Sequence, residues 1–239
     1  MKRAIGTSIV VCVTMLLVAP SYAQRPDFSA FEQSIKQLDD PNWKTRSAAF
    51  YALLTLGGAG AEPEDALSRL LQKWPERSDQ IKLALIKLLQ KENALTKERD
   101  DLILQKYAKE GGNFLHPFPD AEERSAYYPD VIGVVTVLKD PRAIDALIGA
   151  IETGGMVGTA LVELGDAAVD RVIGVLDSGE VVARGAATGI LADMLDTKNA
   201  HRVTDPGSRR KITEALTRAA RDPNQRIRDF AHEALKKLR

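Results

Sequence analysis

The chain has 239 residues, with 33 basic residues, 33 acidic residues and a single cysteine, Cys12. Because Cys12 lies in a segment that is expected to be removed, the rest of the chain has no thiol for a disulfide, a metal thiolate or a cysteine nucleophile. Burial of apolar surface must therefore hold the fold, and the length is sufficient for one extended domain or two lobes.

Residues 1–23 have the pattern of a secretory signal peptide. Two basic residues near the start precede an apolar run over residues 9–18, and small residues end at Ala23, which predicts cleavage before Gln24. The run is shorter than the about 20 residues of a membrane span, and we expect no transmembrane segment in the mature chain. An uncleaved anchor is the alternative. The pattern predicts an exported protein, either periplasmic or secreted.

Residues 24–110 show apolar side chains at helical spacing, with glycine and proline between the apolar stretches. No segment shows the sustained alternation that is typical of strands. We therefore expect N-terminal helical repeats over this range. The predicted helices lie at 28–38 and 43–56, and three more begin at Pro63, Ser78 and Thr96, the last of them ending at Gly111.

An irregular segment at 111–119 interrupts this pattern, because its glycines and prolines suit neither a helix nor a strand. It is predicted to connect two lobes. Much of the small aromatic content of the chain gathers beside it. These rings either fill the gap between the lobes or form exposed anchors for a partner peptide or glycan. The group consists of Phe114, His116, Phe118, Tyr127 and Tyr128.

Residues 120–239 are predicted to form the C-terminal repeats. Short helices are expected at 120–128 and 129–138, and a cleaner helical series begins at Asp140. A polar insertion at 196–208 lengthens one repeat and is predicted to be a mobile surface loop. The repeat lengths on either side of it fall near those of two-helix repeats.

The chain contains one short phrase twice. Asp40-Pro41-Asn42 leads into Arg46, and Asp222-Pro223-Asn224 leads into Arg228, with the same spacing to the alanine and leucines that follow. Internal repetition of this kind indicates a stack of similar helical units. We therefore predict an all-α fold, an α-solenoid of antiparallel helix pairs.

At these residues the chain resembles HEAT-like repeats, especially the short bacterial kind that also occurs in phycobilisome lyases. The resemblance is strongest over 140–195, good at 39–57 and 222–238, and weak over 62–128. In it, residues 140–148 correspond to a first helix and 181–195 to its second helix. The resemblance implies a curved superhelix that serves as a scaffold or adaptor.

The resemblance also implies a structural role for Asp40 with Arg46 and for Asp222 with Arg228. In such families an aspartate at the turn and an arginine on the next helix form a hydrogen-bonded ladder between successive repeats. Arg184 lies seven residues after Asp177 rather than six, and the unit at 155–165 has no arginine, so the ladder is expected to be interrupted at these units.

No catalytic, cofactor-binding or metal-binding residues are predicted. The three histidines show no zinc-ligand spacing, and the chain has neither a phosphate-binding loop nor a nucleophile elbow. Charge is unevenly distributed, with a net charge of −9 over residues 120–197 and +7 over 198–239. The basic end is either a solvated cap of the stack or a site for a polyanion, and export argues against nucleic acid as a partner.

These observations predict an exported, non-enzymatic scaffold or adaptor that binds a protein or peptide on its helical-repeat surface. The second helices would present the binding face, which in the last pair includes Asp229, His232, Glu233 and Lys236. The alternative is an enzyme or enzyme subunit related to the lyase branch of the family, because acid and base residues on distant helices leave no sequence trace.

Overall fold

The computed structural model describes residues 28–110 and 121–237, in which helices are joined by turns and short loops. The predicted all-α class is confirmed, since neither range contains a strand. The predicted signal peptide at 1–23 and connector at 111–119 lie outside these ranges. The α-helices are α1 (Ser29–Gln37), α2 (Trp43–Thr55), α3 (Pro63–Lys73), α4 (Ser78–Glu110), α5 (Ala121–Thr136), α6 (Ile144–Gly149), α7 (Gly155–Leu164), α8 (Val169–Ser178), α9 (Val181–Leu195), α10 (Pro206–Ala219) and α11 (Gln225–Lys236).

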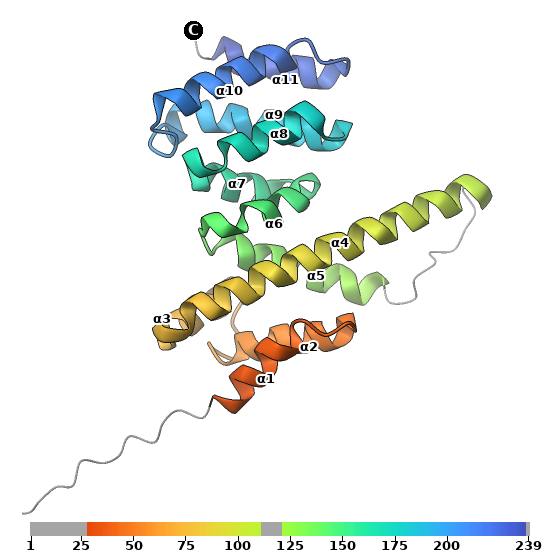
Figure 1. Ribbon diagram of the computed structural model, residues 1–239, viewed down its shortest axis with the longest axis vertical. Helices are drawn as coiled ribbons and strands as arrows, with labels where there is room; N and C mark the ends of the chain where they lie inside the picture. The colour runs from red at the N-terminus through yellow and green to blue at the C-terminus, as the bar shows by residue number, and fades with distance from the viewer. Residues whose placement is uncertain (1–27, 111–120, 238–239) are drawn as a thin grey trace, which may run out of the picture.

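The helices are stacked along the long axis of the molecule, from α1 and α2 at one end to α10 and α11 at the other (Figure 1). Contacts between helices define two layers. The first layer consists of α4, α6, α8 and α10, each packed on the next. The second layer consists of α2, α3, α5, α7, α9 and α11, packed in that order. Pairs such as α8 with α9 contribute one helix to each layer, so the core lies between the layers.

Apolar residues three or four positions apart form the buried faces of the helices. Ile81, Leu85 and Leu89 of α4 are fully buried, and so are Leu161 of α7 and Leu191 of α9. Such residues lie on one side of a helix. The periodicity of the sequence therefore predicted these faces correctly.

One pairing of helices differs from that implied by the family resemblance. Residues 181–195 form α9, which packs across the core mainly against α8. Residues 140–148 form a short 3₁₀ turn and α6. Helix α6 packs against α7, which is the next α-helix along the chain. The intervening helices α7 and α8 are short and rich in glycine and valine, so the repeat pattern missed α7 as the partner of α6 and α8 as the partner of α9.

The Asp-Pro-Asn phrase builds the same turn twice. The Asp40 carboxylate accepts a hydrogen bond from the N–H of Asn42 at 2.7 Å, and the Asn42 side chain caps α2 by accepting one from the N–H of Lys44 at 2.9 Å. Asp222 and Asn224 repeat this arrangement before α11. An asparagine at the N-cap provides an acceptor for a backbone donor that the helix leaves free.

An arginine on the following helix holds each turn through backbone carbonyl groups. Nη1 of Arg46 donates to the carbonyl oxygens of Asp40 and Pro41, at 2.8 and 2.9 Å. Arg228 makes the corresponding two bonds in the second copy, at 2.6 and 2.8 Å. These arginines therefore fix the turn that precedes their own helix.

The bonds between repeats involve two further residues. Arg184 of α9 donates from Nε and Nη2 to the two carboxylate oxygens of Asp222, at 3.0 and 3.1 Å, and from Nη1 to the carbonyl of Gly179 at 3.1 Å. The predicted interruption at Arg184 is therefore wrong, because the longer spacing still brings the guanidinium to the turn. Near the N-terminus, Nε of Arg46 donates to Oε1 of Glu92 on α4 at 2.6 Å.

The pair of Arg184 and Asp222 should make stability depend on pH. The hydrogen bond from Arg184 holds the pKa of the Asp222 carboxyl below its usual value. The stabilisation is therefore fully present above about pH 4 and is lost as the pH falls through the lowered pKa of the folded state. We expect Asp222→Asn to be less stable than wild type at neutral pH, with a difference that shrinks in acid. Urea titrations at several pH values measure it, and a constant difference would contradict this role.

Two pairs of predicted helices are single helices in the structure. The helices predicted to begin at Ser78 and Thr96 form α4, because residues 90–98 contain no glycine or proline. The two predicted at 120–138 form α5, with Pro129 inside it. An interior proline costs about 3 kcal/mol, and burial of valines such as Val131 offsets that loss. The C-terminal part of α4 projects beyond the neighbouring helices (Figure 1).

The polar segment at 196–208 is packed against the stack, which corrects the expectation of a mobile loop. The side chain of Val203 is fully buried, and Arg202 pairs with Glu163 of α7 at 3.3 Å. The Asp166 carboxylate accepts hydrogen bonds from the N–H and hydroxyl of Thr204, at 3.0 and 3.2 Å. The polar composition predicted exposure, but one apolar side chain and two acids hold the segment in place.

Candidate partner-binding surface

The outer surface of the first layer is charged, and ion pairs link its helices. Each pair joins a basic residue to an acid of the preceding first-layer helix, with N–O distances between 2.6 and 3.0 Å. Pairs this exposed contribute at most about 1 kcal/mol each, but they provide these charges with partners inside the chain. The pairs are Arg142 with Asp79, Arg171 with Asp145, Lys211 with Asp170, and Arg218 with Asp177.

The second layer exposes apolar side chains instead. In the described part of the chain, every exposed large apolar residue lies on a second-layer helix or directly after one. Single exposed apolar residues are common on protein surfaces, but a random scatter would place them on both layers. The residues are Tyr51 on α2, Val137 after α5, Met156 on α7, Val181 and Val182 on α9, and Phe230 on α11.

Charged residues are sparse in the middle of the same layer, on α7 and α9. Helices α7 and α9 contain only Glu163, Arg184 and Asp193, whereas the first-layer helices α8 and α10 contain eight charged residues. Glu163 pairs with Lys139 at 3.1 Å, and Arg184 pairs with Asp222 at 3.0 Å. The middle of the second layer therefore presents a weakly charged surface.

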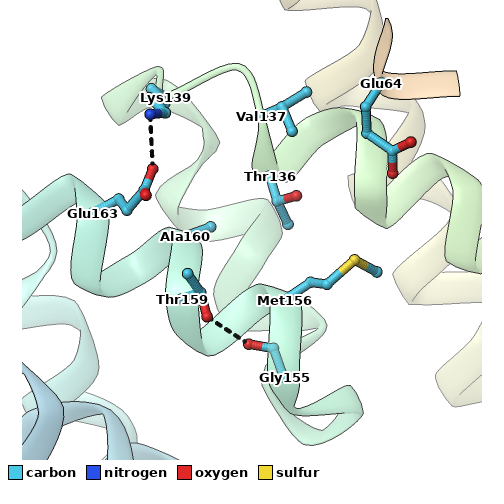
Figure 2. A pocket seen from close by; sticks show the side chains of 9 residues that line it. All are labelled: Glu64, Thr136, Val137, Lys139, Gly155, Met156, Thr159, Ala160 and Glu163. Carbon is cyan, nitrogen blue, oxygen red and sulfur yellow. Dashed lines mark hydrogen bonds and ion pairs between the residues drawn. The ribbon is translucent and has the colours of Figure 1, made fainter. Parts of the chain in front are cut away.

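A groove of about 680 Å³ opens on this layer between α3, α5 and α7 (Figure 2). Val137 and Met156 line it and are 41% and 53% exposed. The ion pair of Lys139 and Glu163 lies on one side, and the Glu64 carboxylate lies on the opposite side (Figure 2). The groove thus combines apolar walls with one acid that stands apart from the ion pair. Its other lining residues are Thr136, Gly155, Thr159 and Ala160.

Glu64 is held at the groove by its place in the fold. It lies in the first turn of α3, where an acid interacts favourably with the helix dipole. Its carboxylate packs on α5 at Gly133, where a Cβ atom would lie only 2.2 Å from Oε1. The glycine therefore makes room for this carboxylate. The side chain is partly buried, and no basic residue in the described ranges forms an ion pair with it.

A second groove of about 680 Å³ lies between α9, the start of the 196–208 segment and α11. Phe230 lines it and is 44% exposed, and the Arg226 guanidinium lies 5.4 Å from the centre of its ring. Asp193, Glu233 and Lys237 also line this groove. It is more polar than the groove in Figure 2 and carries charges of both signs.

Tyr127 is buried, which favours the alternative in which this ring fills space between helices over the one in which it is an exposed anchor. Its side chain is 1% exposed, and its ring packs edge-on against Phe50 with the centroids 5.7 Å apart. Burial and, secondarily, the charge of Glu92 raise the pKa of its hydroxyl. Tyr128 is partly buried, and its hydroxyl donates to Oδ1 of Asn93 at 2.7 Å. The rest of the predicted aromatic group lies outside the described residues: Phe114, His116 and Phe118.

The predicted residues of the last helix all lie on its exposed side. Asp229, His232, Glu233 and Lys236 are exposed on α11, and Asp229 accepts a hydrogen bond from Nε2 of Gln225 at 2.6 Å. Glu233 lines the second groove. Their role in partner binding stays a prediction.

Sequence reasoning missed the residues that form the groove in Figure 2, above all Glu64 and Met156. An apolar residue on a helix is normally read as core, and only the placement of α7 shows that Met156 is exposed. One signal was present in the sequence, namely the scarcity of charge over 155–164 and 181–195. Glu92, the buried partner of Arg46, gave no signal, because it lies in a charged stretch of α4.

Among the side chains that the structure describes, no group of three or more histidine, cysteine or acidic residues is arranged to hold a metal ion. The helices of the described ranges include none with a length and apolar content sufficient for a membrane span. Comparison of the chain with known protein families, curated proteins and solved structures finds no match. A functional assignment must therefore come from the repeats and the geometry of the surface.

Proposed function

We propose that this chain is an exported, non-enzymatic scaffold or adaptor that binds a protein or peptide partner on its second layer. In this proposal the helices form an α-solenoid of HEAT-like pairs, and the first 23 residues are removed on export. The two packed layers and the duplicated turn with its arginine support the architecture. Open stacks of this kind offer extended surfaces for binding.

The difference between the two layers is the observation that carries the proposed function. First-layer acids and bases pair with one another, as Lys211 does with Asp170 at 2.8 Å. The second layer leaves apolar side chains such as Val182, which is 62% exposed, in contact with water. Covering such a surface is favourable by about 25 cal/mol per Å², whereas none of the large apolar side chains that the structure describes on the first layer is exposed to this degree.

The extent of this surface favours a macromolecular partner. The exposed apolar residues run from Tyr51 on α2 to Phe230 on α11, which lie near opposite ends of the stack. A small molecule cannot contact both. A protein or an extended peptide can, and stable protein interfaces bury roughly 1,200–2,000 Å² in total.

A charge placed on either layer tests the proposal. We expect Val182→Glu to abolish capture of the partner from an envelope extract, because it puts a carboxylate in the apolar surface. Thr217→Glu adds the same charge at an exposed first-layer position on α10 and should leave capture unchanged. Affinity capture followed by mass spectrometry measures both. Equal capture by the two variants would remove the second layer as the binding face.

A further inference from the structure

We infer that the groove between α3, α5 and α7 binds a peptide segment in which a large apolar residue lies next to a lysine or arginine. This inference rests on the proposed function and specifies the chemistry of the partner at one place on the second layer. It depends on three features of the groove: its apolar walls, its charge balance and the fixed position of one carboxylate.

The apolar walls account for the large apolar residue. Val137, directly after α5, and Met156 on α7 line the groove and are about half exposed, at 41% and 53%. Figure 2 shows the Met156 side chain extended toward the side on which Glu64 lies. Methionine is unbranched and polarisable, so it adapts to side chains of different shapes. A volume of about 680 Å³ admits a side chain together with its flanking backbone.

The charge balance accounts for the basic residue. Three of the nine lining residues are charged, namely Glu64, Lys139 and Glu163. Nζ of Lys139 lies 3.1 Å from Oε2 of Glu163, and Nη2 of Arg202 lies 3.3 Å from Oε1 of the same carboxylate. These pairs occupy both oxygens of Glu163. The remaining charge in the groove is the Glu64 carboxylate, so a cation complements it and an acidic peptide is repelled.

The position of Glu64 makes it a selective contact. Glu64 lies in the first turn of α3, and its carboxylate lies against α5 at Gly133. A group that is already in place loses little conformational entropy when a ligand binds. Partial burial strengthens the attraction, because fewer water molecules screen it. The lysine or arginine of the peptide is therefore expected on the α3 side and the apolar residue against α7.

Selection from a random peptide library tests this assignment with the full mature chain. Peptides displayed on phage are selected in parallel on wild type, on Glu64→Lys and on Glu62→Lys, which changes an exposed acid two residues earlier. We expect wild type and Glu62→Lys to enrich an apolar residue beside a basic one. Glu64→Lys should lose the preference for the basic residue. Circular dichroism of each variant verifies that it is folded.

A selected peptide then provides the affinity measurement. Glu64→Gln, which keeps the size of the side chain, should weaken binding about tenfold in fluorescence polarisation, the loss of one charge-assisted hydrogen bond. Met156→Asp should weaken it at least as much. Absence of basic residues among the selected peptides, or equal affinity for wild type and Glu64→Gln, overturns the inference.

The outcome is separable from that of the proposed function. If Val182→Glu loses the envelope partner while Glu64→Lys retains it, the second layer binds the partner and the groove assignment is wrong. If both variants lose it and Thr217→Glu retains it, the groove is part of the binding surface. If Val182→Glu and Glu64→Lys both retain it, both assignments fail.

Discussion

Glu92→Leu is expected to lower the free energy of unfolding by about 3 to 5 kcal/mol. Arg46 and Glu92 are both fully buried, and Nη2 of the arginine lies 2.6 Å from Oε1 of the acid. Removal of the acid leaves a guanidinium charge in the core with no counter-charge beside it. Glutamate and leucine have side chains of similar volume, so the loss of stability should come mainly from the uncompensated charge. Urea denaturation followed by circular dichroism measures it.

Two controls separate this effect from a general loss of packing. Arg46→Met combined with Glu92→Leu removes both charges and should recover part of the lost stability, although the bonds to the turn carbonyls are also lost. Asp222→Leu removes the acid of a pair that is only partly buried, in which the side chain of Arg184 is 18% exposed and that of Asp222 is 9% exposed. Its cost should be smaller, about 2 kcal/mol. A cost for Glu92→Leu no larger than this would show that water reaches the guanidinium of Arg46 and compensates its charge.

Local sequence rules account for much of the fold. Glycine, proline and capping residues mark most helix ends, and apolar spacing marks the buried faces, because both depend on neighbouring residues in the chain. The duplicated Asp-Pro-Asn phrase predicted two equivalent turns for the same reason. Helices α4 and α5 were each predicted as two helices, because a weak local signal for a helix start was given more weight than the packing of the surrounding residues. Thr96 can cap a helix and Pro129 can begin one, but the surrounding residues continue the helix instead.

Contacts between distant residues could not be predicted in this way. Glu92 lies 46 positions from Arg46, and Asp222 lies 38 positions from Arg184. Neither spacing follows from a local rule, since it depends on how the helices stack. The surface presents the same difficulty. Whether Val182 faces the core or the solvent depends on which layer α9 joins and which neighbours cover it.

One of the contacts that hold the 196–208 segment is a close approach of two backbone segments. Gly165 ends α7 with φ +57°, a conformation that side chains with a Cβ rarely adopt, and a Cβ there would lie 2.0 Å from the carbonyl oxygen of Arg202. The next N–H, that of Asp166, donates to this same carbonyl at 3.3 Å. The glycine therefore lets the segment pack on the end of α7.

Gly165→Ala is expected to cost about 3 to 5 kcal/mol, because backbone strain and a clash with a backbone atom add together. The clash cannot be relieved by a side-chain rotation, so the segment around Arg202 must move. We expect buried Val203 to become partly exposed and its amide to exchange faster with deuterium. Urea denaturation and hydrogen exchange measure the two effects.

Gly174→Ala is the matched control for this prediction. Gly174 lies within α8, and a Cβ there would meet nothing within 4 Å. Alanine at an open helical position should stabilise the protein by about 0.5 to 1 kcal/mol. The same chemical change is thus expected to act in opposite directions at two positions 9 residues apart. Equal effects at both positions would show that the segment at 196–208 does not need its contact with α7, and that the packed arrangement contributes little to the stack.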